Sequence, residues 1–164
     1  MSGPALRLQP GGFVLYMTMA SKLADFAAAQ DPVYDAVLRE LAAGRKESHW
    51  ICFIFPQLAG LGFSAMSEKF GIASVDEARS YLRHPVLGTR LRECTRLLLA
   101  GTGRDIRAML GSPDDLKFRS SMTLFAQADP AEPLFQAALE RFFGGEQDAL
   151  TLDLLKKRSP PQRP

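Results

Sequence analysis

A complete set of helix signals at residues 31–44 constrains the fold of this chain more than any other feature. In "DPVYDAVLRELAAG", Asp31 suits an N-cap, Pro32 suits the first helical position and Gly44 is a typical stop. Between them, apolar residues recur every three or four positions, which places them on one face of a helix. The segment predicts an amphipathic helix that packs by its apolar face.

Similar signals recur along the chain. Ser74 and Glu77 have capping-box spacing, and Ser112 followed by Pro113 predicts another helix start. No Asn-Gly or Asp-Gly hairpin signal and no alternating apolar and polar run indicates a strand. We therefore predict an all-α fold, a single compact domain of about eight short helices in a non-repeat orthogonal bundle.

Length and composition agree with one folded domain. The chain has 164 residues, of which 46% are hydrophobic and 23% charged, as in ordinary globular proteins. Residues 1–19 are predicted to be a disordered extension, with Met17 or Met19 as an alternative start, and residues 157–164 a disordered tail. The helical domain is expected to span residues 20–156.

The charge balance and the missing motifs exclude several classes of function. A net charge of +2 gives no general attraction to nucleic acid or anionic membranes, and no apolar run reaches 18 residues. Nucleotide-binding glycine loops and zinc-ligand spacings are also missing from the sequence. We expect a soluble cytoplasmic protein without metal or cofactor, and with Cys52 and Cys94 reduced.

The stretch "ESHWICFIFPQ" at residues 47–57 is ambiguous between a buried strand and a buried helix. A strand needs a partner, and the other β-like segment, "GFVLYM" at 12–17, lies in the expected extension. We therefore favour a helix that is apolar on all sides and central.

Three segments together resemble a known bacterial family: "GRKESHWICFIFPQLAGLG", "ARSYLRHPVLGTRLREC" and "GSPDDLKFRSSMTLF". The family is the domain of unknown function numbered eighteen-ten, some of whose members carry the label calpastatin. The resemblance covers about residues 22–155 and implies a mainly helical single domain, but no activity or catalytic residue. A calpastatin would be a disordered inhibitor, which this helix-rich sequence contradicts. Many relatives have an aromatic or Met-aromatic pair where this chain has Ile51-Cys52, a departure that argues against thiol chemistry as a function of the family.

Two segments could supply a ligand site. In the first, Arg45 and Lys46 could form a cationic rim, Trp50 a floor, and His49 an acid, base or anion ligand. A solvated turn and a packed histidine are the simpler interpretations. Gln57 could contact a ligand or hold the "LAGLG" loop that follows it.

The second segment is "KFRSSMTLF", a helix with apolar residues on two sides. Its polar groups could line a cleft with a ligand-neutralising cation, or its hydroxyls could bond back to the helix. The candidate ligand-binding residues across both segments are Arg45, Lys46, His49, Trp50, Gln57, Lys117, Arg119, Ser120 and Ser121.

These patterns predict a cleft between residues 45–57 and 117–123 that binds a small anionic or nucleotide-like ligand. The alternative is a protein-interaction module without catalysis. That alternative expects Phe63, Phe70 or Trp50 in an exposed apolar patch.

Overall fold

The structure is a computed structural model that describes residues 10–158, and these residues form ten helices and no strand. The predicted all-α single domain is confirmed. The helices are α1 (Pro10–Gln30), α2 (Tyr34–Ala43), α3 (Ile51–Ile54), α4 (Ala65–Lys69), α5 (Val75–Arg83), α6 (Leu87–Ala100), α7 (Ile106–Leu110), α8 (Asp114–Ala128), α9 (Pro133–Phe143) and α10 (Ala149–Arg158).

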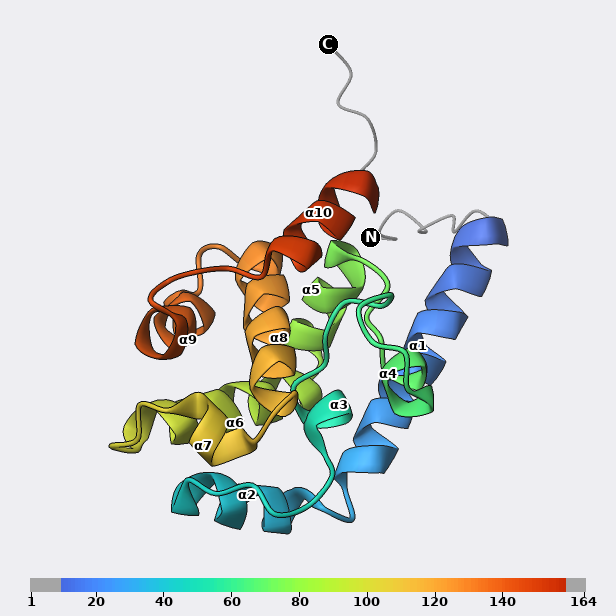
Figure 1. Cartoon of the computed structure of the whole chain (residues 1–164). Helices are drawn as coiled ribbons and strands as arrows, with labels where there is room; N and C mark the ends of the chain where they lie inside the picture. The colour runs from blue at the N-terminus through green and yellow to red at the C-terminus, as the bar shows by residue number, and fades with distance from the viewer. Residues whose placement is uncertain (1–9, 159–164) are drawn as a thin grey trace, which may run out of the picture.

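Helix α8 lies at the centre of the fold, in contact with α3, α5, α7, α9 and α10 (Figure 1). Its Phe118 side chain is fully buried. The Phe118 ring lies 4.9 Å from the ring of Phe55 on one side, and 6.0 and 6.2 Å from those of Phe142 and Phe143 on the other. Because α8 is buried on most sides, its few polar side chains must find partners within the protein or line a hollow.

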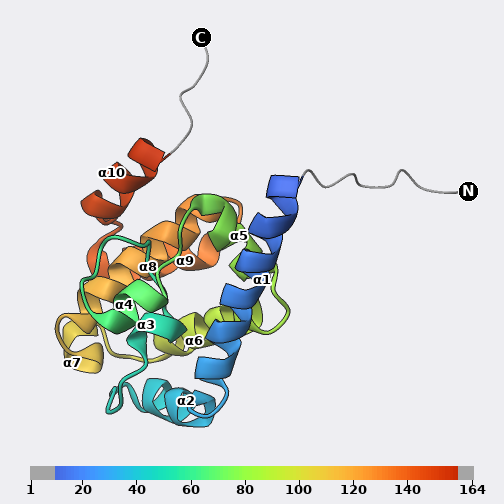
Figure 2. The same cartoon turned by 90° about the vertical axis from the view of Figure 1, so that its right-hand side faces the viewer.

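Helix α1 runs along one edge of the domain (Figures 1 and 2), and in Figure 1 its first half stands apart from the other helices. Residues 10–19, which the sequence analysis assigns to a disordered extension, form the first half of α1. Residues 1–9 and 159–164, the rest of the expected extension and tail, lie outside the described residues.

The stretch at 47–57 contains the short helix α3, and the rings of Trp50 and Phe55 on either side of it are 1% exposed. The expected buried helix is thus present, although it has only four residues. After it the chain extends, and Leu58 makes an isolated parallel bridge with Ile72. The β-like segment at 12–17 lies in α1 and pairs with nothing as a strand.

Some predicted helix boundaries are confirmed. Gly44 ends α2 with a φ of 68°, and the Ser74 hydroxyl accepts from the backbone N–H of Glu77 at the start of α5. His84, which follows α5, accepts through its Nδ1 from the N–H groups of Val86 and Leu87 at 3.2 Å. These boundaries could be predicted because each depends on a residue and its near neighbours in the sequence.

Two predicted helix starts are wrong. Asp31 does not cap α2, which begins at Tyr34 after a turn; its carboxylate pairs instead with Arg90 at 2.8 Å. Ser112 does not cap α8 either, because the cap position falls on Pro113 and the helix begins one residue later. Helix α4 was not predicted, although the Ser64 hydroxyl caps it by accepting from the N–H of Ser67.

Candidate functional site

One wall of the candidate site is the segment between α2 and α3. Gly44 turns the chain out of α2, and the Lys46 N–H then donates to the carbonyl of Met109 at 2.8 Å. Trp50, which follows, is buried, so the chain is held at both ends of this segment. The backbone thereby presents residues 46–50 to the start of α8.

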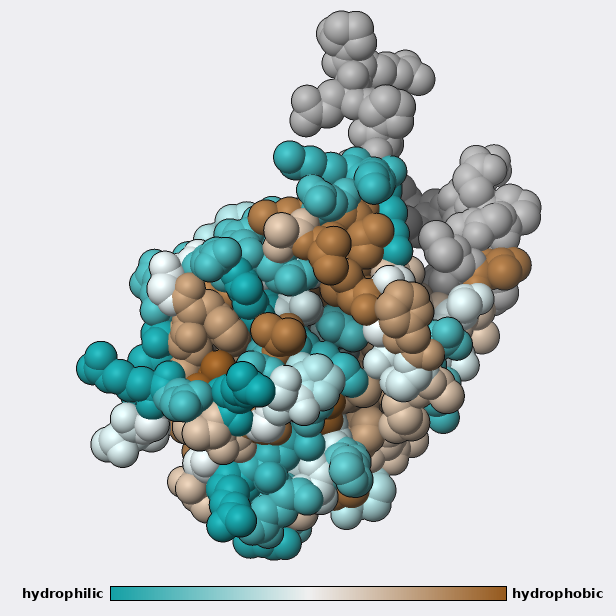
Figure 3. Space-filling view, viewed as in Figure 1, coloured by the Kyte–Doolittle hydropathy of each residue, from teal (hydrophilic) through white to brown (hydrophobic). Residues whose placement is uncertain are grey.

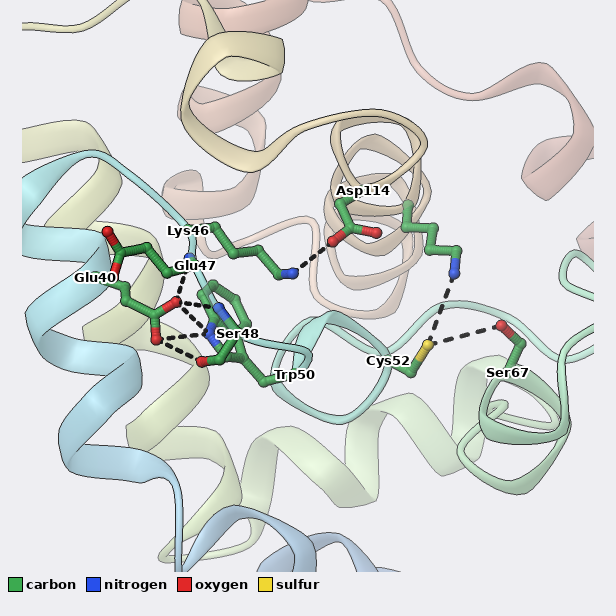
Figure 4. Close-up of polar contacts among 9 residues, drawn as sticks. Glu40, Lys46, Glu47, Ser48, Trp50, Cys52, Ser67 and Asp114 are labelled. Carbon is green, nitrogen blue, oxygen red and sulfur yellow. Dashed lines mark hydrogen bonds and ion pairs between the residues drawn. The ribbon is translucent and has the colours of Figure 1, made fainter.

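The Glu40 carboxylate holds this wall in place (Figure 4). It accepts hydrogen bonds from the backbone N–H groups of Glu47 and Ser48, from the Ser48 hydroxyl at 2.6 Å, and from the Trp50 indole at 3.4 Å. Burial alone would raise the pKa of Glu40, but these donors stabilise the charged form and hold the pKa below its ordinary value of 4.5. Glu40 was missed in the sequence, where it is only one of several charges on the exposed side of α2.

A pocket of about 160 Å³ lies between this wall, α3, α4 and the start of α8. It combines apolar side chains with two lysines, an aspartate, a histidine and a thiol. The lining residues are Lys46, His49, Trp50, Ile51, Cys52, Phe53, Met66, Asp114 and Lys117.

The two lysines of the pocket differ in their partners. The Lys46 ammonium lies 2.7 Å from the Asp114 carboxylate and 5.2 Å from the centre of the Trp50 ring, and its side chain is 7% exposed. The Lys117 ammonium lies 3.8 Å from the Cys52 sulfur, its one polar partner among residues 10–158. Among residues 10–158, no carboxylate lies within 4.0 Å of it. Lys117 is therefore a cation that the described protein does not neutralise by direct contact.

The structure brings four of the nine sequence candidates to this pocket: Lys46, His49, Trp50 and Lys117. Segments 45–57 and 117–123 do meet, through contacts between α3 and α8. The other five candidates lie elsewhere.

Arg45 and Gln57 belong to the first segment but not to the pocket. Arg45 is exposed and borders a separate surface hollow with Arg39, Glu40 and Ser48. Gln57 is buried; its carbonyl accepts from the N–H of Ile72, and its side chain packs beside the 58–62 loop.

Arg119 and Ser120 have structural partners on α8. The Arg119 guanidinium donates to the carbonyls of Glu146 at 3.0 Å and Gln147 at 3.2 Å, and it pairs with the Glu146 carboxylate at 3.1 Å. Ser120 bonds back to the carbonyl of Leu116 at 3.1 Å. For these two residues the simpler interpretation holds.

Ser121 differs from its neighbours because it is fully buried and its hydroxyl has no hydrogen-bond partner in the described protein. It lies one helical turn after Lys117, so the two residues share a face of α8. No hydrogen bond joins them, which removes the geometry that a Ser/Lys nucleophile pair would need.

Cys52, Met66 and Asp114 are pocket residues that the sequence did not identify. The Cys52 sulfur lies 3.7 Å from the Ser67 hydroxyl as well as close to Lys117 (Figure 4). Its position between apolar neighbours in the sequence indicated an inert core thiol. In the short helix α3, however, residue 52 points away from the neighbouring buried residues and is partly exposed.

A larger hollow of about 870 Å³ lies between α5, α10 and the end of α8. Its arginines already have partners: Arg79 pairs with Asp76 at 3.0 Å, and Arg158 donates to the Ala59 carbonyl at 2.6 Å. Because its charges are of both signs and largely exposed, we regard it as a gap between packed helices rather than a ligand site.

The apolar patch expected for an interaction module is only partly present. Phe63 is 91% exposed and Met66 is 44% exposed, but Phe70 and Trp50 are buried, contrary to that expectation. Figure 3 shows brown apolar areas separated by teal hydrophilic ones on this face. Phe70 is buried because its ring packs against those of Phe26 and Phe53.

Within residues 10–158, no group of three or more His, Cys, Asp or Glu side chains could hold a metal ion. In the same part of the chain, no helix is long and apolar enough to span a membrane.

Comparisons with known proteins place the chain among uncharacterised relatives. A family model described as "Protein of unknown function (DUF1810)" matches residues 20–155. The crystal structure of the conserved hypothetical protein Rv1873 from Mycobacterium tuberculosis, at 1.38 Å, is similar, with 51% sequence identity and a TM-score of 0.80. That match covers 82% of this chain and 96% of the other. The search of curated proteins found no match.

Proposed function

The chain belongs to the DUF1810 family of proteins of unknown function, so its function must be argued from its own residues, and we propose that the pocket at Lys117 binds a small anionic ligand. The proposal rests on one observation: the Lys117 ammonium has no carboxylate partner among the described residues. An ammonium group that lines a pocket without a carboxylate partner favours an anion there. Lys46 does not compete for this role, because Asp114 already neutralises it.

The size and lining of the pocket limit the ligand. Ligand pockets commonly measure about 300–1,000 Å³, whereas this one measures about 160 Å³. A carboxylate or phosphate group fits such a volume, and the rest of a nucleotide-like ligand would lie outside it. Trp50 and Phe53 supply the apolar wall, and His49, which is exposed, supplies a second group for the anion at the rim.

Thermal unfolding in the presence of single anions tests the proposal. We expect inorganic phosphate, acetate or a nucleoside monophosphate to raise the Tm of the wild-type chain in a concentration-dependent way. Lys117→Met should abolish the shift and His49→Ala should reduce it. Lys156→Met is the matched control, because it removes an equally charged but exposed side chain of α10.

If the Lys117→Met and Lys156→Met variants shift as much as the wild-type chain, the anion binds elsewhere and the proposal is wrong. If no anion in the series shifts the wild-type Tm at millimolar concentration, the pocket is not an anion site for these groups.

The second candidate function is protein interaction, favoured by the exposure of Phe63 next to Met66. An aromatic ring that is 91% exposed is a common anchor for a partner, but two residues make a small patch. Phe63→Ser should then abolish co-purification of a partner while leaving the anion-dependent Tm shift unchanged.

A further inference from the structure

We propose that Cys52 and Lys117 form an acyl-transfer pair, in which Cys52 takes an acyl group from a small thioester and passes it to the Lys117 amine. The Cys52 sulfur and the Lys117 nitrogen lie 3.8 Å apart, and both residues line the same pocket. Acylation of Lys117 would also remove anion binding, and this consequence rests on the proposed function; the acyl transfer itself does not.

The two groups are held at this separation by buried structure. Cys52 lies in α3 between Ile51 and Phe53, which are both buried. Lys117 precedes Phe118, which is fully buried in the core. Fixing two reacting groups side by side turns an encounter between two molecules into a step within one, which can raise the rate of such a reaction substantially.

No other cysteine of the chain has this arrangement. Cys94 is completely buried, and its burial raises the pKa of the thiol to about 12, so it is neither accessible nor ionised at neutral pH. Cys52 is partly exposed and is therefore the thiol that an external thioester can reach.

The chemistry balances in two steps. In the first, the Cys52 sulfur attacks the thioester carbonyl; a new carbon–sulfur bond forms and the old one breaks. The proton of the Cys52 thiol passes through water to the departing sulfur, so the donor leaves as a free thiol. In the second, Lys117 gives one proton to water, and its amine attacks the acyl carbon on Cys52. The carbon–sulfur bond breaks, an amide forms on Lys117, and Cys52 recovers its thiol.

The product changes the pocket. An amide carries no charge, so acylated Lys117 no longer offers a cation to an anionic ligand. Lys46 remains paired with Asp114 and does not replace it. Acylation should therefore switch off anion binding without unfolding the chain.

Peptide mass spectrometry tests the transfer, with S-acetyl-N-acetylcysteamine as the acyl donor. In the folded wild-type chain, Lys117 should be acetylated roughly tenfold or more faster than Lys69 and Lys156, which are exposed. Cys52→Ala should reduce the Lys117 rate to that of the two exposed lysines. In Lys117→Arg the acetyl group should stay on Cys52 as a thioester that hydroxylamine removes.

Equal acetylation of Lys117 in the wild-type chain and in Cys52→Ala would overturn the inference, as would a Lys117 rate no faster than that of Lys69. Circular dichroism of each variant confirms that the fold is intact. Anion binding is measured separately on unmodified protein, so a failed transfer and a failed anion site give different results.

Discussion

The two faces of α8 carry basic side chains that lie two residues apart yet differ in every contact. Arg119 faces the α9–α10 connection, where two carbonyls and a carboxylate accept from it and the Phe143 ring lies 5.6 Å away. Lys117 lines the pocket, and within the described part of the chain its ammonium has one polar partner, the Cys52 sulfur. The difference teaches that a basic residue becomes a site candidate by lacking protein partners, not by its position in a motif.

The largest expected effect comes from the residue that separates the two faces. Phe118→Ala should lower the free energy of unfolding by about 3–5 kcal/mol, because the ring is fully buried between Phe55 and the α9 aromatics. Urea unfolding measures the loss. Phe118→Leu should cost clearly less, because it leaves a smaller cavity. Equal losses would show that the volume of this side chain is not what stabilises the core.

Glu40→Ala tests the wall opposite the Lys117 face, with an expected loss of about 1–2 kcal/mol at pH 7 from charge-assisted bonds to partly solvated donors. The folded pKa of Glu40 lies below 4.5, so its stabilisation is complete above that pH and is lost as the pH falls through the folded value. The stability difference between wild type and variant should therefore shrink below pH 4.5. A difference that stays constant from pH 7 to pH 3 would show that the carboxylate charge is not what holds the wall.

Arg119→Ala should cost about 1 kcal/mol, since the carbonyls of Glu146 and Gln147 lose their donor while remaining near solvent. Anion-dependent Tm shifts should be unchanged in this variant. Loss of the shift would contradict the assignment of Arg119 to structure, and Arg119→Lys should recover only part of the stability because lysine cannot reach both carbonyls at once.

The smallest effect on stability is expected for Lys117→Met, at most about 0.5 kcal/mol, because no carboxylate in the described protein depends on this ammonium. Urea unfolding without added anions measures it. A loss above about 1.5 kcal/mol would give Lys117 a structural role like that of Arg119 and remove the contrast between the two faces.

Much of the fold was predictable because helix signals act locally. Gly44 and Ser74 behave as their types and neighbours indicate. Asp31 does not, because Arg90, about sixty positions further along the chain, provides a better partner than the local backbone. A start signal thus fails where a distant charge captures the capping side chain, and nothing near Asp31 in the sequence reveals this.

The candidate site was predictable only in outline. The sequence analysis predicted that segments 45–57 and 117–123 meet, because both combine aromatic and basic residues. It could not separate Lys117 from Arg119, since both are basic residues of the same helical segment "KFRSS". It also missed Glu40 and Cys52, whose roles depend on which atoms the fold places beside them.

The Leu58–Ile72 bridge has a consequence for how this site could diversify. Two hydrogen bonds at the bridge, from Ala59 N–H to the Ile72 carbonyl and from Ile72 N–H to the Gln57 carbonyl, tie the loop between them at its base. That loop carries Met66 and Ser67, which border the pocket and the Cys52 thiol. If the pocket binds an anion as proposed, exchanging the exposed residue Met66 in this loop should change the pocket lining while the two hydrogen bonds keep the base of the loop in place.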